Sequence, residues 1–182
     1  SLKLAFATLF LNRTNRSGII SGGPVGGLNQ NSKTQIYARF NKQTLIKKIN
    51  TVASLKSKIK LTNYDALKLT KKIRNSINAN NSFIFFDPPY FKQGKNLYFT
   101  SFDKRGHQKL SSEILSLTNY FWITTYDVDK NIELFYSSCN KRFKYQLKYF
   151  ANNKRRGTAS ELLFASDILN IESFSNVELS EF

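Results

Sequence analysis

An unbroken apolar run that ends at a carboxylate and two prolines is the feature that most limits the fold of this chain. Residues 83–86 read Phe-Ile-Phe-Phe, and Asp87-Pro88-Pro89-Tyr90 follows directly. An apolar run of this length fits a strand that is buried on both faces, as in the middle of a parallel α/β sheet. The prolines end the strand, because neither can donate a hydrogen bond to the ladder. We therefore expect Asp87 at the carboxyl end of a central strand, the edge of an α/β sheet where ligands bind.

These four residues suit one kind of chemistry, the activation of an amine on a nucleobase. Such an amine is a poor nucleophile, because its lone pair is delocalised into the ring. If Asp87 and the Pro88 carbonyl each accept one amine hydrogen, they localise that pair and stabilise the charge that grows during attack. Tyr90 would stack on the base, a contact worth about 1–3 kcal/mol in comparable sites, and the base must first flip out of the duplex. The alternative is an ordinary proline turn in which Asp87 is solvated.

The distribution of charge indicates a nucleic-acid partner. The net charge is +16, and residues 1–64 hold eleven Lys and Arg but no acidic residue. Residues 167–182 hold four acids and no base, so the remainder carries 28 − 8 = +20. A long acid-free segment creates a strong positive field, for which phosphate is the natural partner, although a solvated lysine-rich surface is the alternative.

Five of the eight glycines lie in residues 18–27 and predict a loop with unusual backbone freedom. No apolar strand precedes this loop and the Lys-Ser/Thr of a P-loop is absent, so the pattern does not indicate a phosphate-binding loop. We expect it to contact a DNA groove, with a disordered surface loop as the alternative. The candidate DNA-binding residues here are Arg13, Arg16, Gly22, Gly23, Lys33 and Arg39.

Other residue classes exclude several functions. With the single cysteine Cys139 and the single histidine His107, the chain does not indicate a metal site. No apolar run has the length of a membrane span, and no signal peptide is indicated.

Periodicity predicts strands that alternate with helices, the pattern of an α/β layered sheet. Residues 2–11 are expected to be the end of a helix, and further helices are expected after Asn41 and at residues 67–77, 110–117 and 132–136. The expected strands are residues 59–61, 83–86 and 120–125, with an antiparallel pair at 143–150 and 161–165 around a basic loop.

Several motifs at characteristic spacing resemble the Dam-type, or D12 class, DNA adenine-N6 methyltransferases. They are Phe10-Leu11-Asn12-Arg13, Asn63-Tyr64-Asp65, Asp87-Pro88-Pro89-Tyr90, residues 98–102 with His107, Trp122-Ile123-Thr124-Thr125, and Lys154-Arg155-Arg156-Gly157-Thr158 ahead of Glu161-Leu162-Leu163. The resemblance implies part of a Rossmann-like sheet with an inserted target-recognition region. It implies a recognition region at residues 1–57, the carboxyl-terminal part of the catalytic domain at 58–166, and an acidic tail at 167–182.

The resemblance also implies an activity: methyl transfer from S-adenosylmethionine to adenine N6 in double-stranded DNA, for restriction-modification, in the bacterial cytoplasm at the nucleoid. Residues 87–90 would hold the target amine, and Asp65 and Asp87 would contact the cofactor. The loop with Lys154, Arg155 and Arg156 would join the DNA contacts. A ribosomal RNA guanine-N2 methyltransferase and a non-catalytic DNA-binding fragment are the alternatives.

One departure from the family pattern concerns the cofactor. The family's Phe-x-Gly-x-Gly loop is expected before residue 1, and residues 1–182 do not contain it. In that fold the first two strands lie between the strands expected at 59–61 and 83–86, so both would have open ladder edges. We therefore expect this chain to be the carboxyl-terminal part of a longer enzyme, inactive alone, whose missing segment precedes it or comes from a complementing chain.

Overall fold

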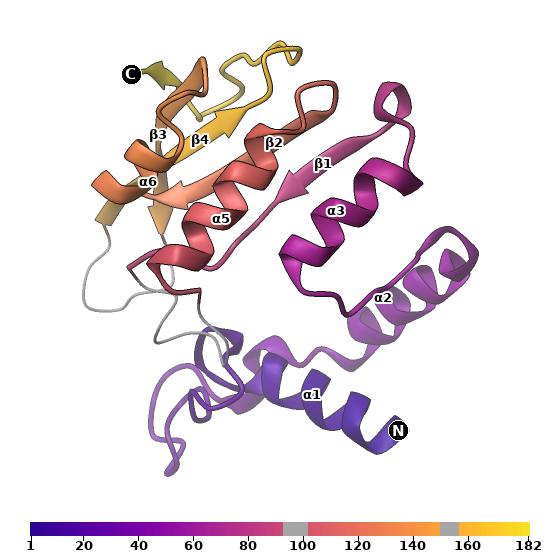
Figure 1. The fold of residues 1–182 in the computed structure, drawn as a ribbon. Coiled ribbons are helices and arrows are strands. Elements are labelled where there is room, and N and C mark those ends of the chain that lie inside the picture. Colours follow the sequence, from indigo (N-terminus) through magenta and orange to yellow (C-terminus); the bar gives the residue numbers. More distant parts are fainter. Residues whose placement is uncertain (93–101, 150–156) are drawn as a thin grey trace. The chain divides into compact units, whose positions relative to one another are not determined.

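The computed structural model describes residues 1–92, 102–149 and 157–182, which form two compact units. One unit is Ser1–Asn63 and the other is Tyr64–Phe182. Each unit is described by itself; Figure 1 shows the ribbon of both. Among the described residues, no helix is both long and apolar enough to cross a membrane.

Helices and turns make up the Ser1–Asn63 unit. Its α-helices are α1 (Leu2–Thr14) and α2 (Lys42–Ser54), and short 3-10 helices cover Arg16–Gly18, Ile36–Arg39 and Lys56–Lys58. The Asn41 side chain caps α2 by accepting a hydrogen bond from the Thr44 backbone N–H at 2.9 Å, because the first N–H groups of a helix have no partner within it. This confirms the helix predicted after Asn41.

The prediction of a strand at residues 59–61 is wrong. Residues 59–65 form no strand, and the Leu61 side chain is 93 % exposed. A short apolar stretch becomes a strand only where a neighbouring strand pairs with its backbone, and no described residue supplies that partner.

The Tyr64–Phe182 unit is a mixed α/β layer with a five-stranded sheet in the order β1-β2-β4-β3-β5. Its elements are α3 (Ala66–Ser76), β1 (Phe83–Phe86), α5 (Lys104–Leu115), β2 (Phe121–Asp127), α6 (Lys130–Phe135), β3 (Lys141–Tyr149), β4 (Gly157–Ala165) and β5 (Ser180–Glu181), with a 3-10 turn at Ala79–Asn81. Strands β1 and β2 are parallel, and the other pairings are antiparallel. The predicted antiparallel pair is confirmed by β3 and β4.

One face of this sheet carries the core, and helices pack on it (Figure 1). Trp122, Tyr126 and Phe164 project from β2 and β4 toward Leu110 and Ile114 of α5. The ring of Tyr136, which follows α6, stacks on Phe164 with centroids 4.3 Å apart. The side chains at alternate positions of the strands point to the opposite face.

The expectation that residues 83–86 form a central strand buried on both faces is wrong for the described sheet. Strand β1 pairs only with β2 and is therefore an edge strand. Its Ile84 and Phe86 side chains pack against the core, whereas Phe83 and Phe85 are 58 % and 55 % exposed. An unbroken apolar run is typical of a strand with both faces buried, but the described part of the chain covers only one face of β1.

Candidate active site at the carboxyl end of strand β1

The carboxylate at the end of β1 is exposed. Asp87 follows Phe86, the last residue of the strand, and Pro88 directly after it is buried. Among the described residues, no hydrogen bond or ion pair of the protein engages the Asp87 carboxylate. The group therefore faces solvent with its acceptor capacity unused, as a ligand-binding carboxylate does.

The Tyr90 side chain is held at its hydroxyl end. Its phenol donates a hydrogen bond to Oε1 of Glu161 on β4 at 2.5 Å. The second oxygen, Oε2, accepts the hydroxyl of Tyr145 on β3 at 2.7 Å. Glu161 is only 3 % exposed, so both donors stabilise a buried carboxylate.

The two residues after Tyr90 are tied to the end of β2. The backbone N–H groups of Phe91 and Lys92 donate to Oδ1 and Oδ2 of Asp127 at 2.7 and 2.9 Å. The Lys92 ammonium donates to the Val128 carbonyl at 2.8 Å and lies 3.6 Å from the Asp129 carboxylate. The turn after the prolines is therefore fixed through both its backbone and its side chains.

Asp129 is ionised more readily than a free aspartate. Burial acts to raise its pKa, but hydrogen bonds from the side chain and backbone of Asn131 and the charge of Lys92 outweigh that effect. The pKa of Asp129 therefore lies below its ordinary value, which keeps its ion pair with Lys92 at neutral pH.

An aromatic cluster supports this turn from the helix side. The Phe91 ring lies 5.2 Å from the ring of buried His107, whose Nδ1 lies 3.3 Å from the Tyr126 hydroxyl. Burial lowers the pKa of His107 below its ordinary value of 6.5 and outweighs the raising effect of Asp127 and Asp103. Burial likewise raises the pKa of Tyr126. His107 is therefore neutral at pH 7 and acts as a packed aromatic ring.

The predicted cofactor residue Asp65 caps helix α3. Its Oδ1 accepts the backbone N–H groups of Leu67 and Lys68 at 3.1 and 3.3 Å. Its Oδ2 accepts no hydrogen bond from the described part of the chain, and the residue is exposed. The structure therefore gives Asp65 a role as a helix cap, and its contact with a cofactor stays a prediction.

The rest of a cofactor site is not found among the described residues. The glycines at 18–27 follow helix α1, whereas a cofactor loop follows a strand and approaches the ligand through its backbone. The residues present thus fit S-adenosylmethionine in part: they provide carboxylates but no glycine loop after a strand.

The glycine-rich loop forms a set of hydrogen-bonded turns. Asn15 and Pro24 form an isolated bridge. The Arg16 N–H donates to the Gly23 carbonyl at 2.9 Å, and Gly23 has φ +71°, a conformation that favours glycine. A Cβ added at Gly22 would lie 3.0 Å from the Arg16 carbonyl oxygen, so this position also needs glycine.

The candidate DNA-binding cations of this unit fall into two groups. The Arg13 guanidinium donates to the Arg39 carbonyl at 2.9 and 2.7 Å, and Arg39 donates to the Asn15 carbonyl, so these two arginines hold the loop together. Arg16 and Lys33 are exposed. The other three predicted cations, Lys154, Arg155 and Arg156, lie outside the described residues.

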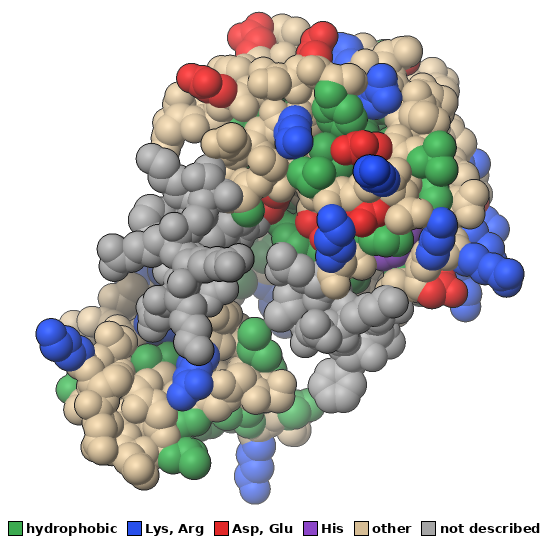
Figure 2. Space-filling model, turned by 90° about the vertical axis from the view of Figure 1, so that its left-hand side faces the viewer, with side chains coloured by type: hydrophobic (Ala, Val, Ile, Leu, Met, Phe, Trp, Pro, Cys, Tyr) green, Lys and Arg blue, Asp and Glu red, His purple; other side chains and the backbone are tan. Residues whose placement is uncertain are grey.

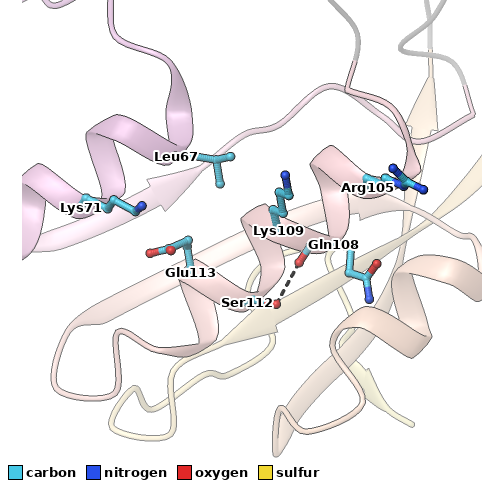
Figure 3. Close-up of a pocket in the computed structure, with 7 residues that line it drawn as sticks. All are labelled: Leu67, Lys71, Arg105, Gln108, Lys109, Ser112 and Glu113. Carbon is cyan, nitrogen blue, oxygen red and sulfur yellow. Dashed lines mark hydrogen bonds between the residues drawn. The ribbon is translucent and has the colours of Figure 1, made fainter.

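A groove lies between α3 and α5 in the Tyr64–Phe182 unit. It has a volume of about 670 Å³ and mixed charge. Its lining residues are Leu67, Lys71, Arg105, Gln108, Lys109, Ser112 and Glu113 (Figure 3). Glu113 is paired with Arg74 at 3.2 Å, and none of the residues described at the end of β1 lines the groove. We therefore do not assign the groove to the reaction.

Sequence reasoning missed the roles of Tyr145, Asp127 and Glu161. Glu161 appeared only as part of a family motif. The sequence offered one signal: Glu161 directly precedes the apolar run Leu-Leu-Phe-Ala at 162–165. An acid beside such a run is expected to be buried with it, and a buried acid needs hydrogen-bond donors.

A mixed α/β sheet with an exposed carboxylate, two prolines and an anchored tyrosine at the end of a parallel strand is compatible with a methyltransferase fold. The family model of the D12 class N6 adenine-specific DNA methyltransferases matches residues 2–149. The chain belongs to this family, and the resemblance drawn from its motifs is confirmed. No curated protein matches the chain. The family implies DNA adenine methylation, with DNA as the substrate.

Proposed function

We propose that this protein transfers a methyl group from S-adenosylmethionine to N6 of an adenine that has flipped out of duplex DNA. The observation that carries the proposal is the exposed Asp87 carboxylate at the end of β1, beside a tyrosine whose hydroxyl is anchored on Glu161. Membership of the family supports the methylation of adenine in DNA.

In this proposal, the residues at the strand end contact the target base. The Asp87 carboxylate and the Pro88 carbonyl each accept a hydrogen bond from the N6 amine, which localises its lone pair and stabilises the growing positive charge. Pro89 fixes the backbone between them and Tyr90. The Tyr90 ring stacks on the flipped base and replaces part of the stacking that the base loses.

When bound, the cofactor would supply an electrophilic methyl group to the N6 lone pair, and the amine proton released after transfer would pass to water. Asp65 and Asp87 would hold the polar groups of the cofactor. A further segment would complete this site by pairing with the open edge of β1 and covering Phe83 and Phe85, whether it belongs to the same polypeptide or to a second chain.

The DNA contacts would come from the acid-free unit. In Figure 2, the part formed by residues 1–63 shows blue and green side chains and no red one, in agreement with its sequence. Arg16 and Lys33 would contact phosphates directly, Gly22 and Gly23 would let the backbone approach the duplex, and Arg13 and Arg39 would hold the loop in shape. Lys154, Arg155 and Arg156 would add a second contact.

This activity fits restriction-modification in the bacterial cytoplasm, on DNA of the nucleoid. A modification enzyme must mark each copy of a short duplex site, which requires both flipping and a positively charged recognition surface.

The proposal is tested by methyl transfer from labelled S-adenosylmethionine with the full-length protein. Duplex DNA should become labelled at adenine N6, and Asp87→Asn should lower turnover by about a hundredfold or more, since one transition-state acceptor is lost. Glu178→Gln is the matched control: it removes one carboxylate from an exposed position in the tail and should leave turnover unchanged. Label that appears only in RNA, or normal turnover in Asp87→Asn, would contradict the assignment.

The contribution of a further segment is tested by titrating this 182-residue chain alone with S-adenosylmethionine in a calorimeter. We expect weak binding or none, because the described residues offer carboxylates without a glycine loop. Micromolar affinity would show that residues 1–182 hold a complete cofactor site.

A further inference from the structure

Two buried carboxylates, Asp127 and Glu161, lie opposite each other in the register of β2 and β4. They are 9 % and 3 % exposed. Like charges directly opposite one another destabilise a sheet, and a buried carboxylate without donors is costlier still. This arrangement is therefore stable only because other groups donate hydrogen bonds to both carboxylates.

Of the four hydrogen bonds that the described residues are seen to donate to these carboxylates, three come from consecutive residues directly after Pro89, namely Tyr90, Phe91 and Lys92. Glu161 accepts the Tyr90 hydroxyl, and Asp127 accepts the N–H groups of Phe91 and Lys92. The carboxylates and this turn thus depend on each other. The turn donates hydrogen bonds that stabilise the buried acids, and the acids hold the turn in place.

The contact with Glu161 determines how the Tyr90 ring is presented. A phenol ring rotates about the bond to its Cβ and swings about the backbone, and a hydrogen bond at its far end limits the swing. The hydroxyl of Tyr145 holds the other Glu161 oxygen at 2.7 Å, so the carboxylate itself has a fixed orientation. A phenol O–H favours the plane of its ring, so a hydrogen bond at the hydroxyl is compatible with stacking of a base on the ring.

We propose that Glu161 is a positioning residue, which holds the Tyr90 ring by its hydroxyl in the orientation that stacks on the flipped base. The proposal rests on the proposed function, since it assigns Glu161 to the same strand-end site. It predicts that Glu161 acts on the reaction only through the Tyr90 hydroxyl.

The contact is tested first by a double-mutant cycle on thermal stability, which does not depend on activity. The variants of the full-length protein are Glu161→Gln, Tyr90→Phe and the combination of both. Glu161→Gln keeps the volume of the side chain, and Tyr90→Phe keeps the ring. We expect the fall in Tm of the double variant to be smaller than the sum of the single falls, because Tyr90→Phe removes the hydrogen bond that Glu161→Gln weakens by replacing a charged acceptor with a neutral amide. Additive falls would overturn the contact.

The role is tested by the same cycle on methyl transfer to duplex DNA. Each single variant should lower kcat/KM by roughly fivefold to tenfold, since a less restrained ring stacks less well, and the double variant should be no worse than either single one. If Glu161→Gln lowers kcat/KM by the same factor in the Tyr90→Phe background, Glu161 does not act through Tyr90 and the proposal is overturned.

A fluorescent base separates positioning from a general loss of structure. The adenine that the wild type methylates is replaced by 2-aminopurine, whose emission rises when it leaves the duplex and is quenched when it stacks on an aromatic ring. We expect brighter emission from complexes of Glu161→Gln and Tyr90→Phe than from the wild-type complex. Equal emission would overturn the proposal.

Failure of the proposed function gives a different result. Suppose that the wild-type protein transfers no methyl group to any duplex while the stability cycle still shows coupling. The contact between Tyr90 and Glu161 is then supported, and both the proposed function and the positioning role are rejected. If the wild type methylates adenine and the activity cycle is additive, the function stands and only the role of Glu161 falls.

Discussion

Asp87 and Glu161 are both carboxylates next to apolar strand residues, but Asp87 follows the end of β1 whereas Glu161 lies in the middle of β4, and their surroundings give them opposite properties. Asp87 is exposed and accepts no hydrogen bond from the described residues, whereas Glu161 is buried under two tyrosine hydroxyls. The first suits contact with a ligand, and the second suits a fixed support. Distinguishing the two required the structure, because the sequence shows only that each acid adjoins an apolar run.

The buried histidine makes stability depend on pH. The pKa of His107 is lower in the folded protein than in the unfolded chain, so the unfolded chain binds the proton first as the pH falls. Stability is therefore fully present above the ordinary value of 6.5 and is lost as the pH falls below it. Urea unfolding between about pH 7.5 and about pH 5.5 should show this loss, and a folded His107→Gln variant should show a flatter profile over that range. An equal slope in the two proteins would contradict this assignment.

Strand β1 shows how far an element can be predicted from its residues. Its position, length and end at Asp87 follow from four apolar residues and two prolines, and the structure agrees. Its place in the sheet does not follow, because burial on both faces requires neighbours that an apolar run cannot specify. The strand expected at 59–61 fails for the same reason, whereas helices α2 and α5 carry their own caps in Asn41 and Asp103 and were predictable.

The two faces of β1 should respond differently to substitution. Phe85→Thr should change the free energy of unfolding of this chain by less than about 1 kcal/mol, because the side chain is half exposed and threonine suits a strand. Phe86→Thr is the matched control on the core face and should cost about 2 kcal/mol or more. Urea unfolding measures both values, and similar costs would contradict the orientation of the strand.

In the whole molecule, charge is unevenly distributed between the two units, and we expect this imbalance to govern the encounter with DNA. The 1–63 unit contributes eleven cations and no acid. Affinity of the chain for duplex DNA should fall at least about tenfold between about 50 and 200 mM salt, since each phosphate contact releases counterions. Arg16→Gln with Lys33→Gln should reduce the slope of log affinity against log salt. Lys130→Gln, an exposed lysine of the other unit, should leave the slope nearly unchanged in the same fluorescence-anisotropy titration.

The whole site was predictable only in part. Residues 87–90 form a local motif, and their position at a strand end needs no tertiary information. The Tyr90–Glu161 contact joins residues 71 positions apart and depends on the register of β4 against β2, which no local pattern contains. Likewise, the use of Arg13 and Arg39 as supports of the loop depends on a contact across 26 residues.

The facing acids on β2 and β4 also bear on how the chain reaches its native topology. A slip of one residue between these strands would turn Asp127 or Glu161 toward the apolar side that holds Trp122 and Phe164. Misaligned sheets are thereby penalised by buried, unpaired charge. We therefore expect the alignment of the strands and the assembly of the Tyr90 turn to occur together, because the turn donates hydrogen bonds to both acids.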